Sequence, residues 1–147
     1  MDSIRVDLGE KHVAINDDPS RVITFNPNNL IMAEKFERLY SDFQEKRAEI
    51  ESRAAEIEKN DTADENGVLL NMQERIDIFR ELNEYIRGKI DDIFGAGTSQ
   101  IVFGDFMSFD FVVYKQFLDG IMPFFQSARG AKVAQYSSKS YQRKGAK

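Results

Sequence analysis

Two long amphipathic runs joined by a short polar loop constrain the fold of this 147-residue chain more than any other feature. In the first run, apolar residues recur at spacings of three, four or seven from Phe36 to Ile57, and charged residues fill most positions between them. The second run repeats this spacing from Met72 to Ile93. Such spacing is typical of helices with one buried face. The two runs therefore predict an antiparallel helical hairpin over residues 27–94.

The charged end of this predicted hairpin has a thinner apolar stripe than the remainder, from about residue 45 to residue 60 and on the facing helix. One interpretation is a solvated projecting arm. The other is an arm that packs against a second subunit, because a coiled-coil seam is often completed by a partner. Both interpretations stay open, and the second would make the protein a homo-oligomer.

The first 25 residues show the alternation of β-strands. Aliphatic residues alternate with charged or polar ones on both sides of a glycine, at Ile4, Val6, Leu8, Val13 and Ile15. This pattern predicts a β-hairpin with one buried face, and residues 21–25 offer a third strand. Because an isolated hairpin is marginal in water, a helix must cover the small sheet. That helix is expected to begin near Pro27, with Asn26 or Asn28 as its N-cap.

Three glycines punctuate the segment IDDIFGAGTSQIVFGD, residues 90–105. A dinucleotide-binding loop requires a strand, a glycine loop and a helix in that order, with a third glycine where this chain has Gln100. The phosphate-binding P-loop also fails, because no Lys followed by Ser or Thr comes after the glycines. Phosphate binding is therefore the weaker interpretation of this segment.

The stronger interpretation is a structural corner between helices. Gly95 follows the second amphipathic run, where a left-handed glycine commonly ends a helix, and Thr98 or Ser99 can cap another short helical turn. The residues that we expect to form the corner are Gly95, Gly97, Thr98 and Gly104. Those that we expect it to place in the core are Phe94, Ile101, Val102 and Phe103.

The run FMSFDFVVYKQFLDGIMPFF that follows is the most apolar part of the chain, so it is expected to form the central helix. Pro123 should kink or interrupt this helix. The apolar residues expected in the core are Phe106, Phe109, Tyr114, Phe117, Ile121, Phe124 and Phe125. The corner and this helix together take residues 95–129.

The end of the chain is basic. The net charge is −5, yet the chain from Arg129 onward holds six basic residues and no acidic one, so the body is acidic. An acidic body repels nucleic-acid phosphates, which argues against a nucleic-acid-binding role. Residues 130–147 hold too few apolar groups to offset their ordering entropy, which predicts a flexible tail. The tail residues expected to contact a partner are Lys132, Tyr136, Lys139, Tyr141, Arg143 and Lys144.

The predicted fold is thus a single α+β, mainly α domain over residues 1–129, with its sheet in residues 1–25. The chain has no cysteine, which excludes disulfides, thiolate metal ligands and a thiol nucleophile and fits an intracellular setting. It also has no apolar run of the length of a membrane span, and its N-terminus does not resemble a signal peptide. A soluble protein is expected.

Three candidate chemical sites are weak. Residues 62–73 overlay the calcium loop of an EF-hand, but Thr62 and Gln73 stand where its two anchoring carboxylates belong. His12 is the only histidine and is expected on an exposed strand, so neither a two-histidine metal site nor a catalytic triad is at hand. Asp91 and Asp92 are adjacent on a predicted helix and cannot face each other as an acid and base pair. We therefore expect no enzyme activity, metal or cofactor.

The chain resembles a family of phage proteins in four ordered segments: FNPNNLIMAEKF, a charged helical hairpin with ENG at its turn, IDDIFGAGTSQIVFGD and YKQFLDGIMPFFQSAR. It is similar to the tail assembly chaperone-like proteins of siphophages and prophages of Gram-positive bacteria. The resemblance implies a small, mainly helical, non-enzymatic protein of the host cytoplasm. The resemblance implies two partners, the tape measure protein and the tail tube protein. The tail tube protein polymerises around the tape measure protein. A structural virion subunit and a metal-sensing helix-loop-helix module are the alternatives.

Overall fold

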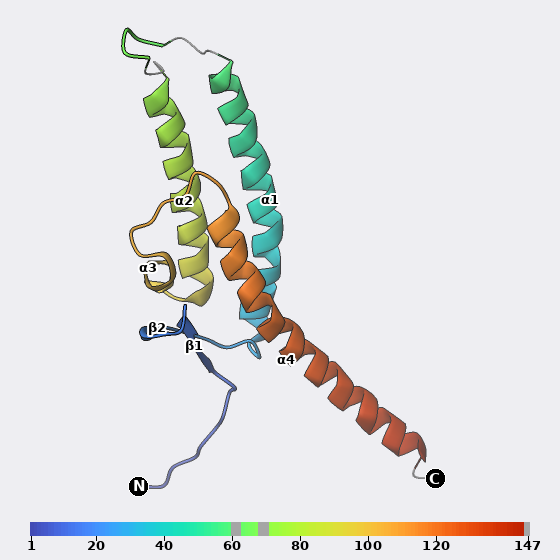
Figure 1. Cartoon of the computed structure of the whole chain (residues 1–147). Coiled ribbons are helices and arrows are strands. Elements are labelled where there is room, and N and C mark those ends of the chain that lie inside the picture. Colours follow the sequence, from blue (N-terminus) through green and yellow to red (C-terminus); the bar gives the residue numbers. More distant parts are fainter. Residues whose placement is uncertain (60–62, 68–70, 146–147) are drawn as a thin grey trace.

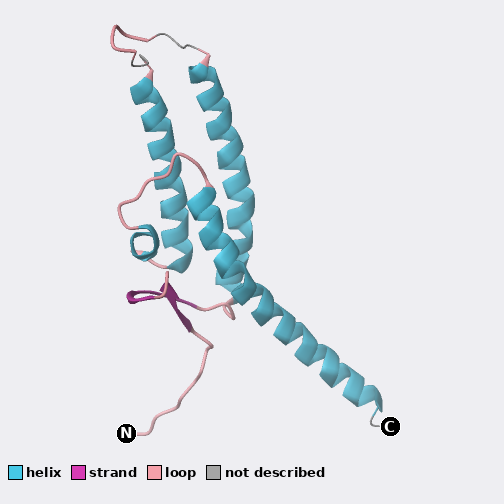
Figure 2. Cartoon of the chain, viewed as in Figure 1, coloured by secondary structure: helices cyan, strands magenta, loops and turns pink. Residues whose placement is uncertain are grey.

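The fold is described from a computed structural model, which covers residues 1–59, 63–67 and 71–145, with side chains described up to residue 128. In this part of the chain two strands are followed by four helices, as the α+β, mainly α prediction requires (Figures 1 and 2). Helices α1 and α2 form a long antiparallel hairpin, and the first part of α4 lies beside it near the small sheet (Figure 1).

The sheet consists of β1 (Lys11–Ile15) and β2 (Asp18–Phe25), paired antiparallel with Val13 opposite Ile23. The turn between them contains Asn16 and Asp17, at φ 53° and 59°. A two-residue turn with two left-handed residues matches the twist of a tight hairpin, and Asn and Asp tolerate that conformation.

The prediction of a strand over Ile4, Val6 and Leu8 is wrong. Residues 1–10 form no strand, and the segment expected as a third strand is the end of β2, so the sheet has two strands in the described residues. The physical reason is that the Asn16 and Asp17 turn closes the hairpin one segment later than the alternation alone suggests.

Helix α1 (Leu30–Glu58) begins at Asn29, whose Oδ1 accepts from the N–H groups of Ile31 and Met32 at 3.0 and 3.4 Å. The predicted caps, Asn26 and Asn28, are therefore corrected by one to three residues. Asn26 forms a local turn instead, because its Oδ1 accepts from the Asn28 N–H at 2.9 Å.

Helix α2 (Met72–Phe94) returns beside α1, and the helical hairpin prediction is confirmed. Near the tip, the Asn71 side chain donates to the Ile57 carbonyl at 2.6 Å and ties the two helices together. Farther down, Glu81 of α2 accepts from Arg53 of α1 and lies 3.8 Å from the Lys46 ammonium. Polar contacts thus join the hairpin where its apolar stripe is thin.

An aromatic cluster joins the sheet, the hairpin and α4 (Val112–Gly145). The Phe36 ring of α1 stacks on Phe125 of α4 at 4.6 Å between centroids, and Phe25 of β2 meets Phe94 of α2 edge to face at 5.9 Å. The burial of large rings from four elements makes this cluster the main stabilising core. The prediction that the aromatic run supplies core residues is confirmed for Tyr114, Phe117, Ile121 and Phe125.

Two aromatic residues of that run are not in the core. Phe106 and Phe109 are 57% and 71% exposed, because the helix begins only at Val112 and the preceding residues form a loop. Just before α4, Asp110 Oδ1 accepts from the N–H of Val112, the first residue of the helix, at 3.0 Å. Pro123 lies inside α4, and the helix continues past it without interruption.

Candidate functional site

The glycine corner links α2 to α4 through the short helix α3 (Thr98–Phe103). Three of its glycines have left-handed φ: Gly95 at 114°, Gly97 at 88° and Gly104 at 58°. Gly95 and Gly97 separate α2 from α3, and Gly104 ends α3. The sequence prediction that this segment turns the chain sharply at its glycines agrees with these angles.

The N-terminus of α3 is satisfied by a side chain of α2. The Asp91 carboxylate accepts from the Ser99 N–H at 2.7 Å and from the Ser99 hydroxyl at 3.1 Å. Thr98 and Ser99 are both buried, and Gly97 is the N-cap, so the prediction that Thr98 or Ser99 caps this turn is corrected. Because a carboxylate already accepts from the first turn of α3, a phosphate would meet negative charge there.

Two arginines donate hydrogen bonds to backbone carbonyls at and just after the C-terminal end of α3. The Arg21 guanidinium of β2 donates to the carbonyls of Ile101, at 3.0 Å, and Val102 at the C-terminal end of α3. The Arg87 guanidinium of α2 donates to the Gly104 carbonyl and, at 3.3 Å, to the Phe106 carbonyl. Cations at the C-terminus of a helix also interact favourably with its dipole. The corner is therefore held by charged hydrogen bonds from two other elements.

Burial at the corner follows the prediction except at one residue. Phe94 and Val102 are buried and Phe103 is partly buried, whereas Ile101 is 37% exposed. A six-residue helix presents only one face to the core, so one of three consecutive apolar residues must point outward.

A cavity of about 480 Å³ lies between the sheet, α3 and α4. Its apolar lining includes Val13, Ile15, Val102, Phe117, Ile121 and Phe124. Arg21, Asn16 and Gln116 supply polar groups to the lining. The residues come from segments about 100 positions apart, so no local motif could reveal the cavity.

The basic segment predicted to contact a partner lies in the last part of α4. The backbone from residue 130 to Gly145 is helical, and the flexibility expected from its composition stays a prediction. The side chains of Lys132, Tyr136, Lys139, Tyr141, Arg143 and Lys144 lie outside the described part of the chain, so their contacts stay predictions. The last buried residue of α4 in the described part is Phe125.

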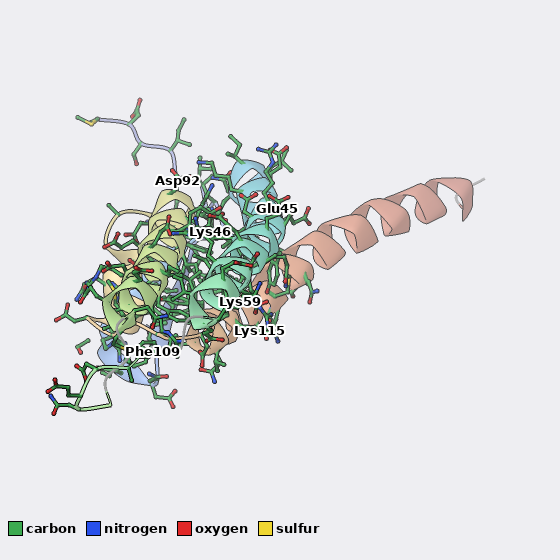
Figure 3. The ribbon with its side chains drawn as sticks, turned by 90° about the horizontal axis from the view of Figure 1, so that it is seen from above. Glu45, Lys46, Lys59, Asp92, Phe109 and Lys115 are labelled. Carbon is green, nitrogen blue, oxygen red and sulfur yellow. The ribbon has the colours of Figure 1, made fainter. Side chains whose placement is uncertain are left out.

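This last part of α4 projects from the body. Figure 1 shows it running away from the hairpin, and Figure 3, seen from above, shows the same separation from the other helices. From Phe125 to Gly145 the helix extends about 30 Å at the usual rise per residue. The basic residues are thus carried on a long helical projection.

The remaining candidates do not form a site in the described residues. His12 is exposed on β1, as predicted, and its Nδ1 lies 3.0 Å from the Thr24 hydroxyl. Within residues 1–59, 63–67 and 71–128, no three His, Asp or Glu side chains are grouped as metal ligands. Thr62 of the calcium-like loop lies outside the described residues, so the absence of calcium binding stays a prediction, which a calcium titration would test.

Comparison with known proteins gives a family but no described relative. None of the described helices is long and apolar enough to cross a membrane. No curated protein and no solved structure matches the chain. A family model described as a family of unknown function, DUF6673, matches residues 20–147. Since this match covers most of the chain, the protein belongs to the DUF6673 family.

Proposed function

We propose that the protein is a non-enzymatic tail assembly chaperone of a siphophage or prophage, acting in the host cytoplasm. In this role it binds the tape measure protein and promotes assembly of the tail tube around it. The proposal is supported by the resemblance of the segments around Asn26, Gly95 and Phe117 to that family. A non-enzymatic role also fits the glycine corner, where backbone polar groups are hydrogen-bonded to side chains of the protein itself.

The observation that carries the proposal is the projecting part of α4. An isolated helix is marginal in water, so a helix that extends beyond the core is best stabilised by a partner that covers it. Its positive charge favours an acidic or helical partner and would accelerate the encounter. We therefore assign capture of the tape measure protein to residues 130–145.

The test compares the full chain with a chain that ends at Arg129, each co-expressed with the tape measure protein of the same phage. Capture of the tape measure protein should be lost in the shortened chain, while its melting temperature stays within a few degrees of the full chain's. Equal capture would contradict the assignment to α4, and a collapse of the melting temperature would show that the segment belongs to the core.

A charge-reversal variant separates charge from helix length. Lys139→Glu, Arg143→Glu and Lys144→Glu together should weaken capture at low salt. The matched control reverses three exposed basic residues elsewhere, Lys11, Lys35 and Arg38, with the same change of net charge. Equal loss in both variants would show a general charge effect and no specific site on α4.

A further inference from the structure

The N-terminal arm, residues 1–10, exposes three aliphatic side chains. Ile4, Val6 and Leu8 are 91%, 70% and 68% exposed, and they alternate with Arg5 and Asp7. In an extended segment such residues share one face. Exposed apolar residues grouped on one face are typical of interaction sites, whereas single exposed aliphatic residues are ordinary on a surface.

Hydrogen bonds at residues 8 and 9, where the arm joins β1, hold the arm away from the edge of β1. The Asn26 side chain donates to the Leu8 carbonyl at 2.9 Å, and that of Asn28 donates to the Gly9 carbonyl at 3.4 Å. Gly9 has φ +82°, and a Cβ on it would clash with the Asn28 amide nitrogen. These contacts fix the arm beside the start of α1, and Figure 1 shows it leaving the body from there.

The cavity between the sheet, α3 and α4 offers the complementary surface. Four consecutive residues line it, from Val13 in β1 to Asn16 in the turn. Successive side chains of a strand point to opposite faces, so a cavity lined by Val13, Ala14 and Ile15 reaches the outer edge of β1. In the described part of the chain, β1 pairs with β2 alone, which leaves that edge without a neighbouring strand.

We propose that the N-terminal arm of one copy inserts into this cavity of a second copy. The arm adds a strand along the outer edge of β1, and its aliphatic face packs on Phe106, which is exposed, and on Val113 and Phe124, which are partly buried. Main-chain hydrogen bonds supply affinity in such strand addition, and the alternate side chains supply specificity. This inference does not depend on the proposed function, because it concerns association between identical chains.

Disulfide trapping tests the contact directly, because the native chain has no cysteine. A chain carrying both Val6→Cys and Gln116→Cys should form disulfide-linked multimers under mild oxidation. A control with Val6→Cys and Glu45→Cys, the latter on the exposed side of α1, should form far fewer. A disulfide within one chain would show that the arm folds onto its own body, and the absence of any disulfide between positions 6 and 116 would equally overturn the proposal.

Analytical ultracentrifugation measures the affinity of the same self-association. Ile4→Asp with Val6→Asp should weaken self-association of the full chain by about tenfold or more, since two buried aliphatic groups are lost. The matched control, Ser3→Asp with Arg5→Gln, makes the same change of net charge on the opposite face of the arm and should retain association. An unmodified chain that sediments as single copies at all concentrations, or equal weakening in both variants, overturns the proposal. Loss of association with normal tape measure capture separates this inference from the proposed function.

Discussion

The side chain of Asn83 on α2 and the backbone of Ser108 form a reciprocal pair of hydrogen bonds. Asn83 Oδ1 accepts from the Ser108 N–H at 2.8 Å, and Asn83 Nδ2 donates to the Ser108 carbonyl at 2.7 Å. The Asn83 amide thus pairs with the Ser108 backbone as two paired β-strand residues do, with one donated and one accepted hydrogen bond. Both residues are buried, and the Tyr114 hydroxyl donates to the same Oδ1. One asparagine therefore fixes the loop and α4 to the hairpin.

Replacing Asn83 by Ala should destabilise the protein by about 3 kcal/mol or more, because it leaves buried donors and acceptors of two other residues, Ser108 and Tyr114, unsatisfied. Tyr114→Phe removes a single hydroxyl from the same cluster and should cost about 1 kcal/mol. Chemical denaturation of both variants gives the comparison. Equal, small losses would mean that water replaces the Asn83 amide and that the cluster is not a structural joint.

Asp91→Ala should destabilise the corner by about 1 kcal/mol, since the carboxylate caps the first turn of α3. Asp91→Asn keeps an acceptor oxygen and should recover much of that loss. Asp92 is the natural control, because it is the adjacent residue and is exposed. Asp92→Ala should change the free energy of unfolding by no more than about 0.5 kcal/mol. A similar loss from both alanine variants would contradict the capping role of Asp91.

The helical hairpin and much of the core could be predicted from the sequence because they depend on local periodicity. The spacing of apolar residues in residues 36–57 and 72–93 decides which face of each helix is buried. The end of α2 at Gly95 could be predicted for a similar reason, since a glycine after an amphipathic run commonly ends the helix.

The incorrect predictions concern features that depend on tertiary contacts or on exact element boundaries. The alternation of Ile4, Val6 and Leu8 indicates one apolar face, but it does not say what covers that face. The sequence predicts a start of α4 at Phe106, several residues before the observed Val112, because composition alone does not locate the first residue of a helix. Asp110 is a signal for the true start, because Asp is common just before a helix and its carboxylate accepts from the first N–H of α4. The cavity could not be predicted, since it depends on how distant segments pack.

Gly95→Ala should destabilise the protein by about 1 to 3 kcal/mol, because φ 114° with ψ 149° is a conformation nearly restricted to glycine. A Cβ there would meet only Thr98 Oγ1, at 4.0 Å, so the cost is backbone strain and not a clash. Gly88→Ala is the matched control, since Gly88 is exposed inside α2 and open space surrounds its Cβ position. It should stabilise the protein by about 0.5 to 1 kcal/mol. Thermal unfolding of the two variants should therefore shift in opposite directions, and a shared direction would contradict the strain at Gly95.

The stability of the protein should fall at alkaline pH, in part because of Tyr114. Burial raises the pKa of the Tyr114 phenol above its usual value of 10.0, so the folded state keeps the proton to a higher pH than the unfolded state does. The contribution of this group is complete below pH 10 and is lost as the pH rises from there through the folded pKa. Burial also raises the pKa of Tyr40, with the Asp119 carboxylate acting in the same direction.

The free energy of unfolding, measured by urea at a series of pH values from neutral to alkaline, should be flat and then decline. Tyr114→Phe should reduce the decline, and Tyr40→Phe should reduce the part that remains, because each variant removes one phenol whose ionisation favours the unfolded state. An unchanged decline in Tyr114→Phe would show that the buried phenol does not report the alkaline transition.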